Sequence, residues 1–253
     1  MLREERKRKI SRFVEEKKRA TVTELSEIFG VSESTIRRDL EELDEQGMVQ
    51  RAHGGAVFVE RAAPEPPIIQ RVVENEEEKR RIGRAAAELV QDGETVFVGS
   101  GTTTLEVARN LVDRDNLTVI TNALNIANLF AGKSNITVIV VGGLLRHSEL
   151  SMIGHITEQV LKELHADKVI MGMRAISVQD GLTNDYLPET MTDRAIINFS
   201  SEVILVADHT KFGKVSTALV APVTVVHKIV TDTAAPPEII EELRELGIEV
   251  ILA

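Results

Sequence analysis

The stretch VSESTIRRDL, residues 31–40, gathers side chains that donate hydrogen bonds to nucleic acids and to anions. It carries the hydroxyl groups of Ser32, Ser34 and Thr35 and the guanidinium groups of Arg37 and Arg38. Arginine can donate two parallel hydrogen bonds to guanine, and serine or threonine can reach bases or phosphates. The alternative is a solvated helix face, which is the commoner role of a pair of neighbouring arginines. The helices and turns predicted around this stretch distinguish between the two roles.

A second stretch, VFVGSGTTTLEVARNL at residues 96–111, is suited to holding a phosphate. It has the pattern of a strand, a glycine-flanked turn and the start of a helix. Gly99 and Gly101 let the backbone approach a ligand closely. The N–H groups of the helix start can surround a phosphate together with neighbouring hydroxyl groups. Those hydroxyl groups belong to Ser100, Thr102, Thr103 and Thr104. An ordinary tight turn is the competing interpretation.

Two further strand ends carry residues that can face a ligand. Asn122 ends the run LTVITN, and Gly142 and Gly143 follow ITVIVV. The amide of Asn122 can bond a ligand hydroxyl, or it can cap the helix that begins near Leu124. The two glycines can leave room for a ligand or simply turn the chain. Both pairs of alternatives stay open on these residues alone.

The stretch ADHTKFGK, residues 207–214, ends another strand and contains Lys211. This lysine can supply a point charge to a phosphate, or it can form a structural contact with Asp208. The turn-like stretch DGLTND, residues 180–185, adds the polar side chains of Asp180 and Thr183. Asp-Gly pairs also form ordinary turns.

The histidines do not suggest a metal site, because they are scattered without the spacing of metal ligands. The positions outside the N-terminal region are His147, His155, His165, His209 and His227. We therefore predict no metal and no other cofactor.

The first 58 residues predict three helices and a hairpin that would present residues 31–40. The expected inward sides are apolar: Ile10, Phe13 and Val14 in the first helix, Leu25, Ile28 and Phe29 in the second, and Ile36, Leu40 and Leu43 in the third. Thr23 and Ser32 are the expected caps of the second and third helices, while Gly30 and Gly47 end them. Ser34, Thr35, Arg37 and Arg38 then project outward, as in a helix-turn-helix. The hairpin MVQRAHGGAVF would form a wing that places Arg51 and His53 against the DNA backbone or minor groove.

The rest of the chain alternates β-branched runs with amphipathic helical stretches. The runs are residues 94–100, 117–122, 136–143, 168–173, 202–208, 224–231 and 248–253. This pattern predicts an α/β protein in which a winged helix-turn-helix is joined to a larger three-layer α/β domain with a mostly parallel sheet. Ligands bind such sheets beyond the carboxyl ends of the strands. The proline-rich run VERAAPEPPIIQ breaks the chain, so we predict a DNA-binding domain at 1–58, a linker at 59–75 and an effector-sensing domain at 76–253.

Composition limits the remaining possibilities. The chain has 253 residues and a net charge of −10. It contains no cysteine, which excludes disulfides and thiolate metal sites. Residues 1–58 hold 12 basic and 12 acidic side chains, so the excess acid lies downstream. A neutral, locally basic head on an acidic protein is compatible with nucleic-acid binding. No apolar run reaches the roughly 18 residues needed to span a membrane, and we expect a cytoplasmic protein.

Residues 23–58, TELSEIFGVSESTIRRDLEELDEQGMVQRAHGGAVF, resemble the winged helix-turn-helix of the DeoR family of bacterial transcription regulators. The motifs GSGTTT, TN, VGG, DGLTN and DHTKFG follow in that family's order, so the resemblance covers essentially the whole chain. It implies a repressor whose C-terminal domain senses a phosphorylated sugar or related metabolite and resembles ribose-5-phosphate isomerase and glucosamine-phosphate deaminase. It also identifies Lys211 as the family's signature lysine.

The stretch MGMRAI, residues 171–176, departs from the resemblance, because these regulators usually read GADGI there. Met173 and Arg174 stand where alanine and aspartate are expected. An arginine in place of a carboxylate favours an anion, so the effector would carry a second negative group, as in a sugar-acid phosphate or a bisphosphate. In the alternative, Arg174 pairs with Asp180 or Asp185 and never meets the ligand.

The sequence thus predicts a regulator rather than an enzyme. Its expected partners are double-stranded operator DNA, a phosphorylated small-molecule effector and further copies of itself in a homodimer or higher oligomer. The absence of the expected carboxylate at position 174 argues against isomerase chemistry. Two other functions stay open at this point: a sugar-phosphate isomerase or deaminase with an appended DNA-binding head, and an interaction module whose winged helix binds protein.

Overall fold

The computed structural model describes residues 2–46, 48–52, 54–58, 60–63 and 65–253. They form two compact units, Met1–Arg61 and Ala62–Ala253. The predicted helix end at Gly47, the predicted wing residue His53 and Pro64 of the predicted linker lie outside the described residues.

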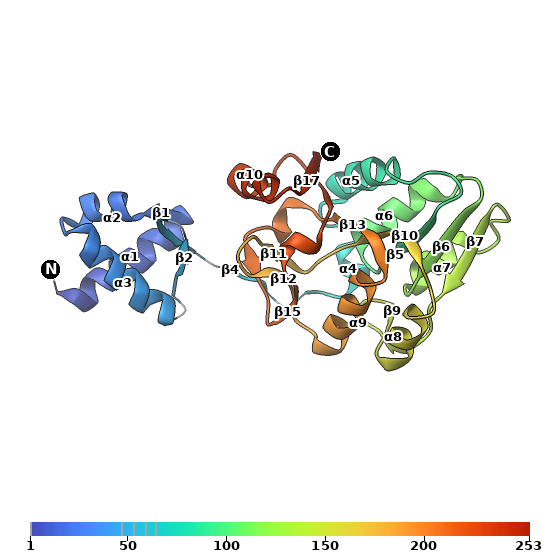
Figure 1. The fold of residues 1–253 in the computed structure, drawn as a ribbon, viewed down its shortest axis with the longest axis horizontal. Helices are drawn as coiled ribbons and strands as arrows, with labels where there is room; N and C mark the ends of the chain where they lie inside the picture. Colours follow the sequence, from blue (N-terminus) through green and yellow to red (C-terminus); the bar gives the residue numbers. More distant parts are fainter. Residues whose placement is uncertain (1, 47, 53, 59, 64) are drawn as a thin grey trace. The chain divides into compact units, whose positions relative to one another are not determined.

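The first unit combines three helices with a small antiparallel sheet (Figure 1). The helices are α1 (Arg3–Lys17), α2 (Val22–Phe29) and α3 (Glu33–Glu45). The sheet has the order β1-β3-β2, from β1 (Arg19–Thr21), β3 (Gly55–Val57) and β2 (Gln50–Ala52). The hairpin β2–β3 confirms the predicted wing strands, and β1 adds a strand that we did not expect. A further short strand, β4 (Glu60–Arg61), ends the unit.

The helix ends of this unit follow its local chemistry. Ser32 caps α3 as predicted, accepting a hydrogen bond from the Thr35 N–H at 3.3 Å. Gly30 ends α2 at a φ of 63°, which glycine adopts without strain. The cap of α2 is Thr21, not the predicted Thr23, because β1 holds Thr21 extended and its hydroxyl accepts from the Glu24 N–H at 3.1 Å.

The predicted apolar sides form the core of this unit with one exception. Ile10, Val14, Leu25 and the α3 residues Ile36, Leu40 and Leu43 are buried. Ile28 was expected to face inward but is 51% exposed. A buried ion pair adds to this core, since the Arg6 Nε lies 2.5 Å from an Asp39 oxygen and joins α1 to α3.

The second unit is built on a seven-stranded parallel sheet of order β17-β16-β13-β10-β5-β6-β7. Every strand corresponds to one of the seven β-branched runs in the sequence. The strands are β5 (Thr95–Val98), β6 (Leu117–Thr121), β7 (Ile136–Val140), β10 (Ala166–Met171), β13 (Ser200–Val206), β16 (Lys228–Thr231) and β17 (Glu249–Leu252). The sheet confirms the predicted fold class.

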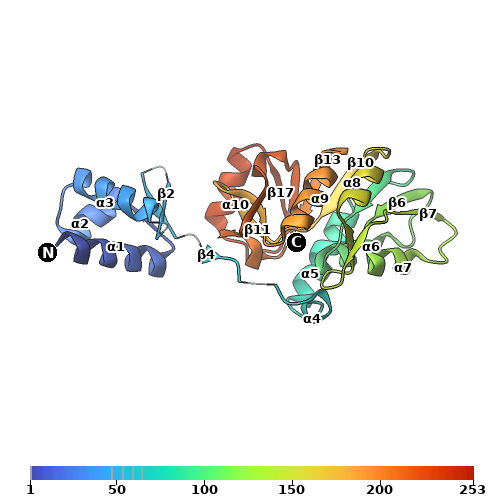
Figure 2. The same cartoon turned by 90° about the horizontal axis from the view of Figure 1, so that it is seen from below.

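Helices cover both faces of this sheet (Figure 2). One face packs against α5 (Glu76–Ala87), α6 (Thr102–Leu111) and α7 (Leu124–Phe130), and the other against α8 (His155–Leu161), α9 (Leu187–Ile197) and α10 (Pro237–Glu245). The contact between α5 and α6 depends on Gly83, because a Cβ there would lie 2.6 Å from backbone and side-chain atoms of Glu106.

Short strands and turns complete the second unit. β8 (Leu144–Arg146) pairs with β9 (Ser151–Ile153), and β12 (Gly181–Asn184) lies between β11 (Ala175–Ser177) and β15 (Ala218–Ala221). Most of DGLTND is therefore strand, where we expected only a turn. A short strand β14 (Lys214–Val215) and two 3₁₀ turns, His209–Lys211 and Val223–Val225, lie between the main elements.

The segment predicted as a linker, residues 59–75, is divided between the two units. Residues 62–75 belong to the second unit, where they contain the helix α4 (Ile68–Arg71). The Ala62 N–H donates to the Val215 carbonyl at 2.9 Å, and the Ile68 N–H donates to the Ser148 carbonyl at 2.8 Å. Ile68 is buried, which ties the segment to the body despite its prolines.

Candidate functional site

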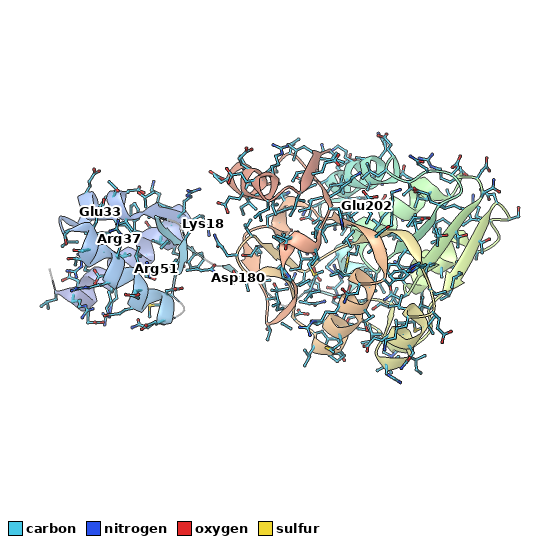
Figure 3. The ribbon with its side chains drawn as sticks, in the orientation of Figure 1. Lys18, Glu33, Arg37, Arg51, Asp180 and Glu202 are labelled. Carbon is cyan, nitrogen blue, oxygen red and sulfur yellow. The ribbon has the colours of Figure 1, made fainter. Side chains whose placement is uncertain are left out.

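The N-terminal half of α3 presents polar side chains to solvent. Ser32, Ser34, Arg37 and Arg38 are exposed, and Thr35 is half-buried. Arg37 lies beside Glu33 one turn earlier, with Nη2 2.8 Å from the carboxylate (Figure 3). An exposed pair of this kind stabilises a helix by no more than about 1 kcal/mol, so it is easily exchanged for another anion.

The rest of the first unit fixes this surface from behind. Asp39 follows Arg38 on α3, and its side chain is only 1% exposed against Arg6. On the wing, Arg51 is exposed and lies 3.4 Å from Glu41 of α3. The buried pair thus holds α3 in place while its polar half stays accessible.

The second unit contains a cavity at the carboxyl ends of its central strands. Residues after β5, β6, β10 and β13 line it, together with residues from the segment 65–79 and from β12 and α9. The strand order reverses between β5 and β10, so the loops after these two strands diverge and leave a crevice. The cavity occupies the place where open α/β sheets bind ligands.

The loop from β5 to α6 forms one wall of the cavity. Gly101 has a φ of 146°, and the Thr104 hydroxyl donates to its carbonyl at 3.0 Å. Thr102, Thr103 and Thr104 are buried at the first turn of α6, whose N–H groups have no carbonyl four residues earlier in the helix. Hydroxyls and N–H donors at the positive end of the helix dipole together suit an anion.

Four basic side chains line the cavity as well: Arg71, Lys79, Arg174 and Lys211. Three of them meet at one oxygen, Oε1 of Glu65. Arg174 Nη1 lies 3.0 Å from it, Arg71 Nη1 lies 3.2 Å from it, and Lys211 Nζ is in hydrogen-bond contact with it. Burial raises the pKa of Glu65, but the charges of Lys211, Arg71 and Arg174 outweigh burial and leave the pKa below its usual value.

Lys79 plays a different part, since it joins α5 to the segment before it. Its ammonium donates to the carbonyl oxygens of Arg71 at 2.7 Å and of Glu74 at 2.5 Å. Burial lowers its pKa, while Asp208 acts in the opposite direction.

Acidic side chains occupy another part of the lining. The Asn184 amide donates to Glu189 at 3.1 Å and to Asp193 at 2.9 Å. Burial raises the pKa of both carboxyls, and the charge of Glu189 raises the pKa of Asp193 further. Burial also raises the pKa of Glu149 to about 7, although its partner Arg71 opposes the shift. Glu149 can therefore carry a proton near neutral pH and donate a hydrogen bond to a neutral group, and the pKa values of Glu189 and Asp193 are shifted in the same direction.

Most of the predicted effector residues come together in this cavity. They are Ser100, Gly101, Thr102, Thr103, Thr104, Asn122, Arg174 and Lys211. Asn122 does not cap α7, whose N-cap is Ala123. Its amide nitrogen donates to the Met152 carbonyl at 2.9 Å, and its buried Oδ1 has no hydrogen-bond partner among the described residues. That oxygen is available to a ligand hydroxyl.

Four predicted residues do not line the cavity: Gly142, Gly143, Asp180 and Thr183. Gly143 allows close packing instead, since a Cβ there would lie 2.1 Å from the Thr157 hydroxyl. The Gly142 carbonyl accepts from that hydroxyl at 2.9 Å. Asp180 accepts from Ser177 at 2.9 Å, and Thr183 accepts from the Ser216 N–H at 2.8 Å. These residues shape the fold around the site.

Arg174 pairs with one of its two expected acidic neighbours, and its contact with a ligand stays a prediction. Its Nε lies 3.8 Å from Asp185, one of the two expected acidic neighbours, and its nearest acidic partner is Glu65. Arg174 nevertheless lines the cavity. Neither Glu65 nor Arg71 was predicted, because both lie in the segment that we expected to be a linker.

The described residues offer neither a membrane-spanning helix nor a cluster of metal ligands. None of their helices has the length and apolar content to cross a membrane. Within the same ranges, no three or more His, Asp or Glu side chains are grouped so as to hold a metal ion.

Comparison with known proteins identifies both units. Residues 6–62 match the DeoR-like helix-turn-helix domain, and residues 74–233 match the DeoR C terminal sensor domain. The chain belongs to the DeoR family. It is therefore a DNA-binding transcription regulator with a sensor domain, and not a sugar-phosphate isomerase or deaminase with an added head.

Curated relatives span almost the whole of this DeoR-family regulator. The transcriptional repressor AccR of Agrobacterium fabrum is 38% identical over 91% of the chain and 90% of its own length. The glycerol-3-phosphate regulon repressor of Escherichia coli K12 is 37% identical over 90% of each protein. The putative aga operon transcriptional repressor of E. coli O157:H7 is 33% identical over 98% of the chain and 93% of its own length.

Among solved structures, ribose-5-phosphate isomerase A of Methanocaldococcus jannaschii is similar over 55% of each chain, at 17% identity and a TM-score of 0.42. The β subunit of eIF2B from Chaetomium thermophilum is similar over 64% of this chain and 53% of its own, at 16% identity and a TM-score of 0.43.

Proposed function

We propose that this regulator represses a carbohydrate operon and that a phosphorylated carbohydrate bound in the cavity of the sensor unit controls its binding to DNA. The observation that carries the proposal is the meeting of the α6 N-terminus with Lys211 and Arg174 at the switch point of the sheet. A helix start and basic side chains in one crevice bind phosphate groups.

The acidic part of the lining suits the carbohydrate portion of such a ligand. The buried Asn122 Oδ1 can accept a hydroxyl proton, and the carboxyls of Glu189 and Asp193 can donate or accept according to their protonation. The name of the E. coli glycerol-3-phosphate regulon repressor also supports a phosphorylated polyol as the class of ligand.

On the DNA side, we propose that residues 1–58 bind the operator. Ser34, Thr35, Arg37 and Arg38 would face the major groove, with Ser32 at the helix start and Arg51 and His53 on the wing. The exposed polar half of α3 supports this assignment. We further propose that two copies bind paired half-sites, as dimeric helix-turn-helix proteins do.

Thermal unfolding of the full chain with candidate ligands tests the sensor assignment. Glycerol 3-phosphate, fructose 6-phosphate and 6-phosphogluconate should include a ligand that raises the unfolding temperature, whereas glycerol, fructose and gluconate should not. A ligand at 100 times its Kd stabilises the folded state by about 2.7 kcal/mol. If the phosphorylated compounds and inorganic phosphate all leave the unfolding temperature unchanged, the cavity is not a phosphate site.

A pair of matched variants locates the effect. Thr103→Val removes a buried hydroxyl at the α6 start with little change in volume, and it should abolish most of the ligand-induced shift. Thr137→Val makes the same change at an exposed position of the edge strand β7 and should leave the shift intact.

A further inference from the structure

The segment that directly follows the first unit places one carboxylate inside the cavity. Glu65 lies between two backbone anchors on the sensor unit, the Ala62–Val215 and Ile68–Ser148 hydrogen bonds. Its side chain is 14% exposed and lines the cavity with the β5–α6 loop. A side chain of the connecting segment therefore reaches the proposed effector site.

The basic side chains around Glu65 outnumber the carboxylate that they share. Arg71, Arg174 and Lys211 all contact the same oxygen, Oε1, so one carboxylate serves three cations. Arg71 has a second acidic partner in Glu149, and the Nε of Arg174 lies 3.8 Å from Asp185. Among the described residues, Lys211 has its ion pair with Glu65 alone, so it depends most on this carboxylate. Within the part of the chain that the structure describes, the buried Nε of Arg174 has no hydrogen-bond partner. A phosphate, with more oxygens and more charge than a carboxylate, would match this set of donors better.

We propose that Glu65 is an internal counter-ion that holds the Arg71, Arg174 and Lys211 cluster until the anionic group of the effector displaces it. The proposal rests on the proposed function, since it requires a phosphate site in the cavity. It assigns Glu65 the role of coupling that site to the chain leading to the DNA-binding unit.

Displacement would act on a segment with little freedom. Pro66 and Pro67 fix the backbone φ next to Glu65, and the Arg71 Nε donates to the Pro66 carbonyl at 2.9 Å. When Glu65 leaves the cluster, the segment around Ala62 is no longer held by a side chain inside the cavity. Its backbone hydrogen bonds to the second unit should then break more often. The effector then has different affinities for the two positions of the segment, which is what coupling between two sites requires.

The test uses the full chain, inorganic phosphate as the probe and chloride to hold ionic strength constant. Glu65→Gln keeps the size of the side chain and removes its charge, so phosphate no longer has an internal competitor. If Glu65 occupies the cluster about nine tenths of the time or more, the variant should bind phosphate roughly tenfold more tightly or better. Asp185→Asn is the matched control, because it removes another acidic neighbour of Arg174 from outside the cavity lining. It should change phosphate affinity much less.

Hydrogen exchange provides the second measurement, and in the wild-type chain it does not depend on any variant folding. In the wild-type chain, phosphate should slow exchange at residues 99–106 and speed it at the Ala62, Ala63, Glu65 and Ile68 amides. Glu65→Gln should show the faster exchange at these amides without phosphate.

The outcomes separate the two proposals. Protection at 99–106 without any change at residues 62–68, or equal or weaker phosphate binding by Glu65→Gln, would overturn the counter-ion role and leave the phosphate site standing. If phosphate neither binds nor protects 99–106 in either chain, the proposed function fails and the counter-ion role fails with it.

Discussion

Arg37 is an exposed arginine whose Glu33 partner is also exposed, so the pair contributes little to the stability of the first unit. Arg37→Ala removes a weak surface pair, so the stability of the first unit should hardly change. If Arg37 contacts a base, specific DNA binding should weaken by about 1–3 kcal/mol and discrimination at one base position should relax. Fluorescence anisotropy on a duplex selected by the chain from a random pool measures both effects.

The salt dependence of binding distinguishes a base contact from a phosphate contact. A phosphate contact would weaken binding to all sequences alike and reduce the slope of log K against log salt. Arg12→Ala is the control, because Arg12 is also an exposed arginine paired with a glutamate four residues away but lies on α1. If DNA binding by every variant were independent of salt concentration, a protein-binding role for the winged helix would be favoured instead.

Glu149 makes stability depend on pH, because its pKa of about 7 lies above the usual 4.5. Between these two pH values the Glu149 carboxyl is protonated more fully in the folded chain than in the unfolded chain. The free energy of unfolding should therefore fall as pH rises through this window, and the contribution is lost above about pH 7. Each unit of difference between the folded and unfolded pKa of Glu149 is worth about 1.4 kcal/mol, so its contribution to the free energy of unfolding is roughly 3 kcal/mol.

Glu149→Gln should therefore reduce the fall in unfolding temperature between pH 5 and pH 8. Part of the fall should remain, because Glu189 and Asp193 also have raised pKa values and act with the same sign. Glu163→Gln, at an exposed position, should leave the pH profile of the wild-type chain unchanged. An identical slope in Glu149→Gln and wild type would show that Glu149 is not the titrating group.

At the scale of elements, α3 depends on the ion pair between Asp39 and Arg6. Removing one partner of a buried pair leaves the other charge buried and unpaired, which costs about 3 kcal/mol. Asp39→Ala should therefore speed amide exchange throughout residues 3–57 and weaken DNA binding, although Asp39 faces away from the proposed DNA surface. Asp44→Ala, on the exposed side of the same helix, is the matched control. Equal exchange in the two variants would refute this role of Asp39.

The strands of the sensor unit could be predicted because each is a continuous β-branched run buried on both faces. Their ends then indicated the β5–α6 loop, Asn122 and Lys211 as cavity residues. Glu65 and Glu149 could not be found in this way, since they come from irregular segments that only the tertiary fold brings to the strand ends. The Gly143 pattern also suggested a ligand contact, but the glycine accommodates Thr157 instead.

At the scale of the whole molecule, the chain combines one DNA-binding unit with a sensor unit. A single unit of this kind contacts one stretch of major groove, and specific binding usually requires a second unit on the same face of the duplex. The phosphate contacts of two units would also make binding steeply dependent on salt. Our proposal of a dimer on paired half-sites therefore has a geometric consequence.

Two half-sites on one face of the duplex are separated by whole turns of about 10 base pairs. Inserting five base pairs between the half-sites of the selected operator should reduce affinity to that of a single half-site, because the second unit would face the opposite side of the duplex. Inserting ten base pairs restores the face and should recover part of the affinity. Anisotropy titrations should give two chains per operator in the intact site and in the ten-base-pair insertion. Equal affinity for all three duplexes, with one chain bound to each, would rule out paired recognition and leave each chain reading DNA alone.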